Sequence, residues 1–181
     1  MGKKRYTVSK AVSVLMTDVD QHAVTSSLAV MLKKNGKVKV PTDIEFFKTG
    51  MFKEIGPDDA DWFYARCASI LRHLYKRRPL GVGRLCKIYG GRLRRGNRPG
   101  RFCKASGGVM RRALKALEDG KMVIRKPNGS RVLTPTLQRD MDRLAQVIIK
   151  IDREVLALQQ KRKKIRKPVS NRMYKIKIRN T

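Results

Sequence analysis

The stretch GPDDADWFYARCASILRHLYKRR, residues 56–78, predicts the amphipathic helix that decides the fold. Asp58 or Asp59 is a favourable N-cap for this helix. At about 100° per residue, the apolar and polar residues that follow separate onto opposite sides. We expect the first side to face a core and the second to present cations beside one indole ring. The core side contains Phe63, Cys67, Ile70, Leu71 and Leu74, and the outer side contains Trp62, Arg66, Ser69, Arg72, His73 and Lys76.

Trp62 and Arg66 lie four residues apart on the outer side, so their side chains are close enough to touch. Together they are suited to stacking on a base or to lying along a phosphate backbone. In the alternative interpretation, Trp62 only packs against a neighbouring helix and Arg66 is a solvated charge. Both interpretations stay open on the sequence of this helix alone.

No Asp or Glu occurs between Trp62 and Leu117, a window of 56 residues that contains 16 Lys or Arg. Its centre, KIYGGRLRRGNRPGRFCK at residues 87–104, combines seven cations with four glycines, and we interpret it as a loop. Surface charge is normally mixed in sign. Glycines let a backbone approach a ligand closely, and arginines fork onto phosphates. The window therefore predicts a polyanion-binding face, on which Tyr89 and Phe102 either stack on bases or anchor the loop.

The totals agree with a polyanionic partner. The chain of 181 residues has 44 Lys plus Arg against 14 Asp plus Glu, a formal net charge of +30. Self-repulsion opposes compaction, so this excess favours nucleic acid first and an anionic membrane surface second. The length suits one domain with extensions. Neither a signal peptide nor a membrane span of ~20 apolar residues is expected. Three widely spaced cysteines are typical of a reducing compartment.

Helical patterns continue on both sides of the window. The first helix is expected from about Asp18 to Asn35, with a stop at Gly36, and Pro41 opens a short helix through Phe47. After the window, Ser106 is expected to cap a helix that runs to Asp119, with Gly120 as its stop. The apolar stripe of the first helix contains Val24, Leu28, Met31 and Leu32.

A hairpin and a long helix complete the pattern. Two β-leaning runs flank residues 127–130, where Asn-Gly is a strong hairpin signal. Helix, basic helix and hairpin is the order of a winged helix-turn-helix. Thr134 is expected to cap the last helix, with Pro135 at its first position. Its apolar seam, Leu137 to Leu158, repeats in steps of four and three.

The second half of this helix, from about Ile148, is expected to run past its own domain. A partner helix or groove is the favoured occupant of its seam, and folding back is the alternative. The tail from Gln159 to Thr181 has ten Lys or Arg and no acid. Alone it is expected to be disordered, and beside a polyanion it is expected to become ordered.

The sequence offers no constellation for catalysis. His22 and His73 lie on separate predicted helices, the cysteines lack metal-ligand spacing, and no GxxxxGK[ST] phosphate loop occurs. We therefore expect no enzyme, no metal, no cofactor and no small-molecule substrate.

Five separated blocks resemble one family. They are GKVKVP (36–41), DWFYARCASILRHLY (61–75), GVGRLCKIYGGRLRRG (81–96), GGVMRRALKALEDGKMV (107–123) and RVLTPTLQRDMDRLA (131–145). Over about residues 18–145 the chain resembles e-type ribosomal protein nineteen of the eukaryotic and archaeal small subunit. The resemblance implies a winged-helix-like domain in the head of the small subunit. It also implies binding to small-subunit rRNA and a part in maturing the rRNA 3′ end and in subunit assembly. The basic face that the family implies contains Arg66, Arg72, Lys87, Tyr89, Arg92, Arg111 and Arg112.

The chain departs from the family in two places. It continues for about 35 residues past the point where the family usually ends, and Leu137 stands where the family commonly has glycine. The resemblance thus gives no function to residues 146–181, for which a contact with rRNA or with another ribosomal protein is expected. The predicted location is the cytoplasmic ribosome, with nucleolar or nuclear passage during assembly in a eukaryote. Expected partners are rRNA and neighbouring small-subunit proteins, without a membrane.

The combined expectation is a mainly α fold: a winged-helix-like domain with a small β-hairpin, a long C-terminal helix and basic extensions. Its parts are a basic extension (1–16), an rRNA-binding domain (17–147), and an extended helix with a basic tail (148–181). The alternative is a DNA-binding architectural protein that places the 106–119 helix in a major groove. A polybasic membrane-surface protein is the third class. The expected RNA-binding residues are Trp62, Arg66, Arg72, Lys76, Arg84, Lys87, Tyr89, Arg92, Arg94, Arg95, Arg98, Arg101, Lys104, Arg111, Arg112 and Lys115.

Overall fold

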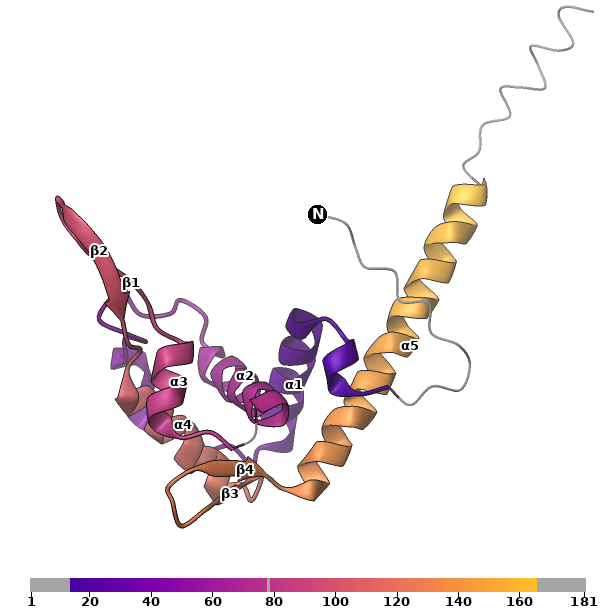
Figure 1. Ribbon diagram of the computed structural model, residues 1–181. Coiled ribbons are helices and arrows are strands. Elements are labelled where there is room, and N and C mark those ends of the chain that lie inside the picture. Colours follow the sequence, from indigo (N-terminus) through magenta and orange to yellow (C-terminus); the bar gives the residue numbers. More distant parts are fainter. Residues whose placement is uncertain (1–13, 78, 166–181) are drawn as a thin grey trace, which may run out of the picture.

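The computed structural model describes residues 14–77 and 79–165, with side chains through residue 160. Figure 1 shows a helical body from which a β-hairpin and the end of the last helix project in different directions. Residues 1–13 of the expected N-terminal extension and 166–181 of the expected tail lie outside the described residues. In chain order the elements are η1 (Met16–Asp18), α1 (Gln21–Asn35), η2 (Thr42–Phe46), α2 (Trp62–Arg77), α3 (Val82–Ile88), β1 (Gly91–Arg95), β2 (Arg98–Cys103), α4 (Gly107–Asp119), β3 (Val123–Arg125), β4 (Arg131–Leu133) and α5 (Pro135–Ile165).

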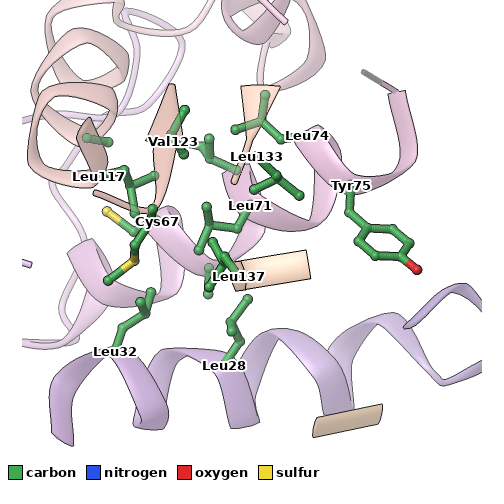
Figure 2. Packing of buried hydrophobic residues seen from close by; sticks show 14 of the residues in the cluster. Leu28, Leu32, Cys67, Leu71, Leu74, Tyr75, Leu117, Val123, Leu133 and Leu137 are labelled. Carbon is green, nitrogen blue, oxygen red and sulfur yellow. The ribbon is translucent and has the colours of Figure 1, made fainter. Parts of the chain in front are cut away.

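The core forms where α1, α2, α4 and α5 meet. Figure 2 shows Leu28 and Leu32 of α1 pointing toward α2, where Cys67 and Leu71 lie. The five residues predicted for the core side of α2 are all 2% exposed or less, so the amphipathic interpretation of this helix is confirmed. Burying one large apolar side chain is worth about 1.5–3 kcal/mol, so this face contributes substantially to the stability of the fold.

One carboxylate joins three elements at the edge of this core. The Tyr75 hydroxyl donates to Asp142 Oδ1 at 2.7 Å, and the Met16 backbone N–H donates to the same oxygen at 3.3 Å. This oxygen therefore links η1, α2 and α5. Met16 itself is 3% exposed, so packing against the core begins before residue 17.

Gly36 ends α1 as predicted, but the helix begins at Gln21 with Asp20 as its N-cap, and the expected start near Asp18 lies in η1. The Asp20 carboxylate accepts hydrogen bonds from the N–H groups of His22 and Ala23, both at 3.2 Å. Gly36 ends the helix at φ 60°, a left-handed conformation that glycine adopts without strain.

The start of α2 corrects the predicted cap. The helix begins at Trp62, and the carbonyl of Asp61, not of Asp58 or Asp59, accepts the first helical bond, from the N–H of Ala65. Asp59 instead accepts the N–H of Asp61 through its carboxylate at 2.9 Å and shapes the turn before the helix.

The predicted cap residues of α4 and α5 directly precede their helices, but their hydroxyl groups do not make the expected capping hydrogen bonds. Ser106 precedes α4, but its hydroxyl makes no capping bond. The Thr134 hydroxyl donates to the carbonyl of Met122 at 3.0 Å and so ties α5 to the start of β3. At the end of α4 the left-handed residue is Lys121, at φ 56°, and not Gly120.

The predicted hairpin is confirmed as β3 and β4. The strands pair antiparallel from Val123↔Leu133 to Arg125↔Arg131, and Gly129 takes φ 75° in the connecting turn. The backbones of Leu80 and Arg131 also exchange two hydrogen bonds, which fix the segment after α2 beside β4. The mainly α fold class with a small hairpin and a long last helix is confirmed, whereas the winged-helix assignment stays a prediction.

The interpretation of residues 87–104 as a loop is wrong. Most of this stretch forms the antiparallel pair β1–β2, in register Gly91↔Cys103 and Leu93↔Arg101, with a turn at Gly96–Asn97 where Gly96 takes φ 66°. The short helix α3, which was not predicted either, precedes it. The glycines are needed for close packing: a Cβ on Gly90 would lie 2.6 Å from the Cys103 carbonyl oxygen.

Two glycine substitutions are expected to act in opposite directions. Gly90→Ala forces the backbones of β1 and β2 apart and should destabilise the protein by about 1–3 kcal/mol. Gly83→Ala lies in α3, where a Cβ meets nothing within 4 Å, and should stabilise by about 0.5–1 kcal/mol because it reduces the entropy of the unfolded chain. Urea denaturation of both variants checks the pair. Equal effects would show that the close contact at Gly90 is not maintained in solution.

The long helix α5 runs past its domain, as predicted. The seam residues Leu137, Met141 and Ile148 are buried, whereas Ile151 and Leu158 are 53% and 59% exposed. The helix continues to Ile165, so the expectation of a disordered tail is wrong for residues 159–165. That a partner covers the exposed half of the seam stays a prediction.

Candidate nucleic-acid interface

The β1–β2 hairpin carries a dense group of exposed cations. The side chains of its five arginines all reach solvent, and none takes part in an ion pair among the described residues. Arg95 and Arg98 even face each other across the two strands, an arrangement of like charges that costs free energy in a hairpin. A polyanion at this surface would remove that cost. The five are Arg92, Arg94, Arg95, Arg98 and Arg101.

A second group of predicted cations lies on α4, and its three members are exposed on the side opposite the core, as predicted. The Arg112 guanidinium lies over the Phe47 ring at 4.2 Å, a cation–π contact that holds it in place. Phe47 was not among the expected site residues. The three are Arg111, Arg112 and Lys115.

The remaining predicted cations are spread over the ends of α2, α3 and β2. Arg84 and Lys87 are exposed on α3, which packs against α4, and Lys104 is exposed just after β2. Lys76 is exposed in the last turn of α2, and Arg72 is half-buried one turn earlier. The structure therefore brings the cations of the hairpin, α3 and α4 onto adjoining elements. Lys76 is not among them, since it lies in the last turn of α2.

Three of the expected contact residues are engaged within the protein. The Arg66 guanidinium lies 4.3 Å from the centre of the Tyr89 ring, and burial lowers the pKa of this arginine. The Tyr89 hydroxyl donates to Ser69 Oγ at 2.7 Å, and burial raises its pKa. The ring of Trp62 meets Phe63 edge-on at 6.0 Å. The partner of Arg66 is thus Tyr89 of the α3–β1 connection, and not Trp62 as the spacing suggested.

This cluster makes the stability of the protein depend on pH. His73 meets the edge of Tyr89 at 5.6 Å, and its Nδ1 is buried without a hydrogen bond. Burial, followed by the charges of Arg72, Arg77 and Lys76, lowers the pKa of His73 from 6.5 to about 4. As the pH falls, His73 takes up a proton in the unfolded chain before it does so in the folded protein. The contribution of neutral His73 to the free energy of unfolding is therefore fully present above about pH 6.5 and is lost progressively toward pH 4.

His73→Phe keeps a ring beside Tyr89 and removes the titration. We expect the free energy of unfolding of this variant, relative to the parent, to rise as the pH is lowered from 7 to 4.5 in urea denaturation. His22→Gln, at an exposed position in α1, is the control and should parallel the parent. A pH-independent difference for His73→Phe would place the acid sensitivity elsewhere.

The described residues contain no group of three or more His, Cys, Asp or Glu that could hold a metal ion. No helix in the same part of the chain is both long and apolar enough to cross a bilayer.

Comparison with known proteins finds one family to which the chain is similar. Residues 15–151 match the family described as Ribosomal protein S19e. The small ribosomal subunit protein eS19A of Drosophila melanogaster is 54% identical over 136 residues, which cover 75% of this chain and 87% of that protein. The eS19 protein of Mya arenaria is 51% identical over 132 residues, covering 73% and 89% respectively. The eS19A protein of Schizosaccharomyces pombe is 41% identical over 141 residues, covering 78% and 98%.

Proposed function

The chain belongs to the ribosomal protein S19e family, and on this premise we propose that it binds small-subunit rRNA as a structural component of the ribosome. The family consists of structural constituents and not of enzymes. The proposed place of the protein is the head of the small subunit, where it supports maturation of the rRNA 3′ end and subunit assembly. Nucleolar passage during assembly belongs to the same proposal.

The observation that carries the proposal is the unpaired charge of the hairpin. Its five arginines are exposed, form no ion pair among the described residues and lie within a window that contains no Asp or Glu. RNA phosphates supply the missing charge, and most contacts are expected to reach phosphate and sugar, so that the protein reads RNA shape more than sequence. The α4 cations extend this surface, whereas Arg66 and Tyr89 support it from within.

A sedimentation experiment tests the proposal. The tagged protein is expressed in its own cells, and the lysate is run on a sucrose gradient at a salt concentration that removes loosely bound basic proteins from RNA. It should co-migrate with the small subunit, with polysomes and with small-subunit precursors. Such salt weakens contacts made by charge alone. Crosslinking of residues 92–104 in those particles should then reach rRNA nucleotides. Release by salt, or sedimentation with chromatin, would contradict the proposal and favour the DNA-binding alternative.

A further inference from the structure

A groove lies at the base of the β1–β2 hairpin, on the side that faces residues 48–51. Its volume is about 560 Å³, within the range of ligand pockets, and it opens widely to solvent. Of its lining residues, Arg101 and Lys104 belong to the expected RNA-binding set and the others do not. The lining includes Lys48, Met51, Leu93, Arg101, Cys103 and Lys104.

Backbone contacts hold the two walls of this groove together. The Ser106 N–H donates to the carbonyl of Thr49 at 2.9 Å, and Gly50 forms a β-bridge with Ala105. The Phe52 ring packs against Gly50 and Gly91 so closely that a Cβ on either glycine would overlap it. The groove is therefore preformed by residues 49–52, β1 and the end of β2, and does not depend on one mobile side chain.

The lining of the groove combines apolar side chains with cations. Met51, which is 73% exposed, a high value for an apolar side chain, and Leu93 belong to its apolar lining. Lys48, Arg101 and Lys104 also line it, and no acidic residue does. A purely apolar ligand would leave the three cations unused, and a bare phosphate would leave the apolar lining exposed. The lining suits a flat, apolar group flanked by negative charges.

We propose that this groove holds an unpaired nucleobase of the bound RNA, with the flanking phosphates on Lys48, Arg101 and Lys104. The inference rests on the proposed rRNA binding and narrows it. Bases inside an A-form duplex present no free face, so the nucleotide belongs to a loop, a bulge or a strand end. The contact gives the hairpin a fixed position on the RNA, which phosphate contacts by themselves define less sharply.

Photocrosslinking in purified subunits tests the groove directly. The substitution Met51→benzoylphenylalanine places a photoreactive group at the lining of the groove, and Arg94→benzoylphenylalanine places the same group on β1 as a control. Tagged particles are purified at high salt and irradiated, and the linked product is identified by mass spectrometry. A nucleotide linked at position 51 is expected. A peptide linked there, or no product while position 94 reaches rRNA, would overturn the groove and leave the proposed function intact. Failure of both positions to reach rRNA would count against the proposed function as well.

Cys103 gives a second readout that needs no substitution. Its thiol lines the groove, whereas Cys67 and Cys86 are buried, and burial raises the pKa of Cys67 to about 12. Maleimide should therefore label Cys103 in the free protein and be blocked in the small subunit. Equal labelling in both states would show that the groove is empty and would overturn the inference.

Affinity provides the third measurement. Met51→Ala removes apolar lining without removing a charge, so it should weaken binding to small-subunit rRNA about threefold to tenfold and leave the salt dependence unchanged. Ile55→Ala, at a residue that is 71% exposed and outside the groove, is the matched control and should bind like the parent. Identical affinities for the two variants would contradict an apolar contact at Met51.

Discussion

Replacing Arg92, Arg94 and Arg95 with alanine is expected to weaken binding to small-subunit rRNA about a hundredfold at 0.15 M salt. Each phosphate contact contributes about 0.7–0.9 to the slope of log K against log salt, so three contacts contribute about 2–2.7. All three side chains are exposed on β1 and none forms an ion pair among the described residues, so the substitutions remove cations without leaving a buried partner. Binding measured at several salt concentrations gives both the affinity and the slope.

A charge-matched triple variant separates local contacts from net charge. Arg139, Arg143 and Lys150 are exposed on α5, outside the predicted surface, and their replacement by alanine also removes three positive charges. This control should lose far less affinity than the hairpin variant and should keep the parent slope. If both triples weaken binding equally, the total charge of the protein dominates. If the hairpin variant keeps the parent slope, the hairpin does not contact phosphate.

The elements predicted best are those with a strong helical period. In α2 and the first half of α5 the apolar residues recur every three or four positions, and the residues predicted to be inside lie in the core or pack against it. The same signal is nearly absent from β1 and β2, because cations and glycines occupy most of their positions. A usable signal did exist: Gly96–Asn97 separates two runs of strand length, and such a dipeptide is typical of two-residue hairpins.

Helix ends and site chemistry depend on contacts that the local sequence does not contain. The Thr134 hydroxyl finds the carbonyl of Met122, 12 residues away in the chain, in place of its own helix. The cation–π partner of Arg66 is Tyr89, which becomes available only because the end of α3 meets α2. Spacing along one helix identified Arg66 as outside the hydrophobic core, but it could not show that an aromatic ring covers it. The cationic surface as a whole was predictable because it depends on composition. The contact between Arg66 and Tyr89 beneath it was not, because it depends on tertiary packing.

Deleting residues 159–181 is expected to leave the fold intact while impairing incorporation into the small subunit. Among the residues whose burial the structure describes, the last buried residue of α5 is Ile148 and residues 151–160 are all exposed, so the described part of the deleted segment makes no core contact. The midpoint of thermal unfolding should therefore change by less than about 2 °C. The deleted segment carries ten Lys or Arg and no acid, one third of the net charge of +30, and we expect these cations to neutralise phosphates. The share of tagged protein that co-sediments with small subunits at high salt measures incorporation.

Charge and apolar surface in this extension are separated by a second variant. Ile151→Ser, Val155→Ser and Leu158→Ser together remove the exposed seam and keep every cation. Since these three side chains are 44–59% exposed, the isolated protein should retain its stability. If the seam docks on a partner protein, this variant should also incorporate poorly, but with an unchanged salt dependence of RNA binding. If the triple serine variant incorporates normally, the exposed seam is not needed, and the cationic tail is the part of the extension that acts in incorporation. A large fall in the thermal midpoint of the deletion variant would instead show that residues 159–181 belong to the fold.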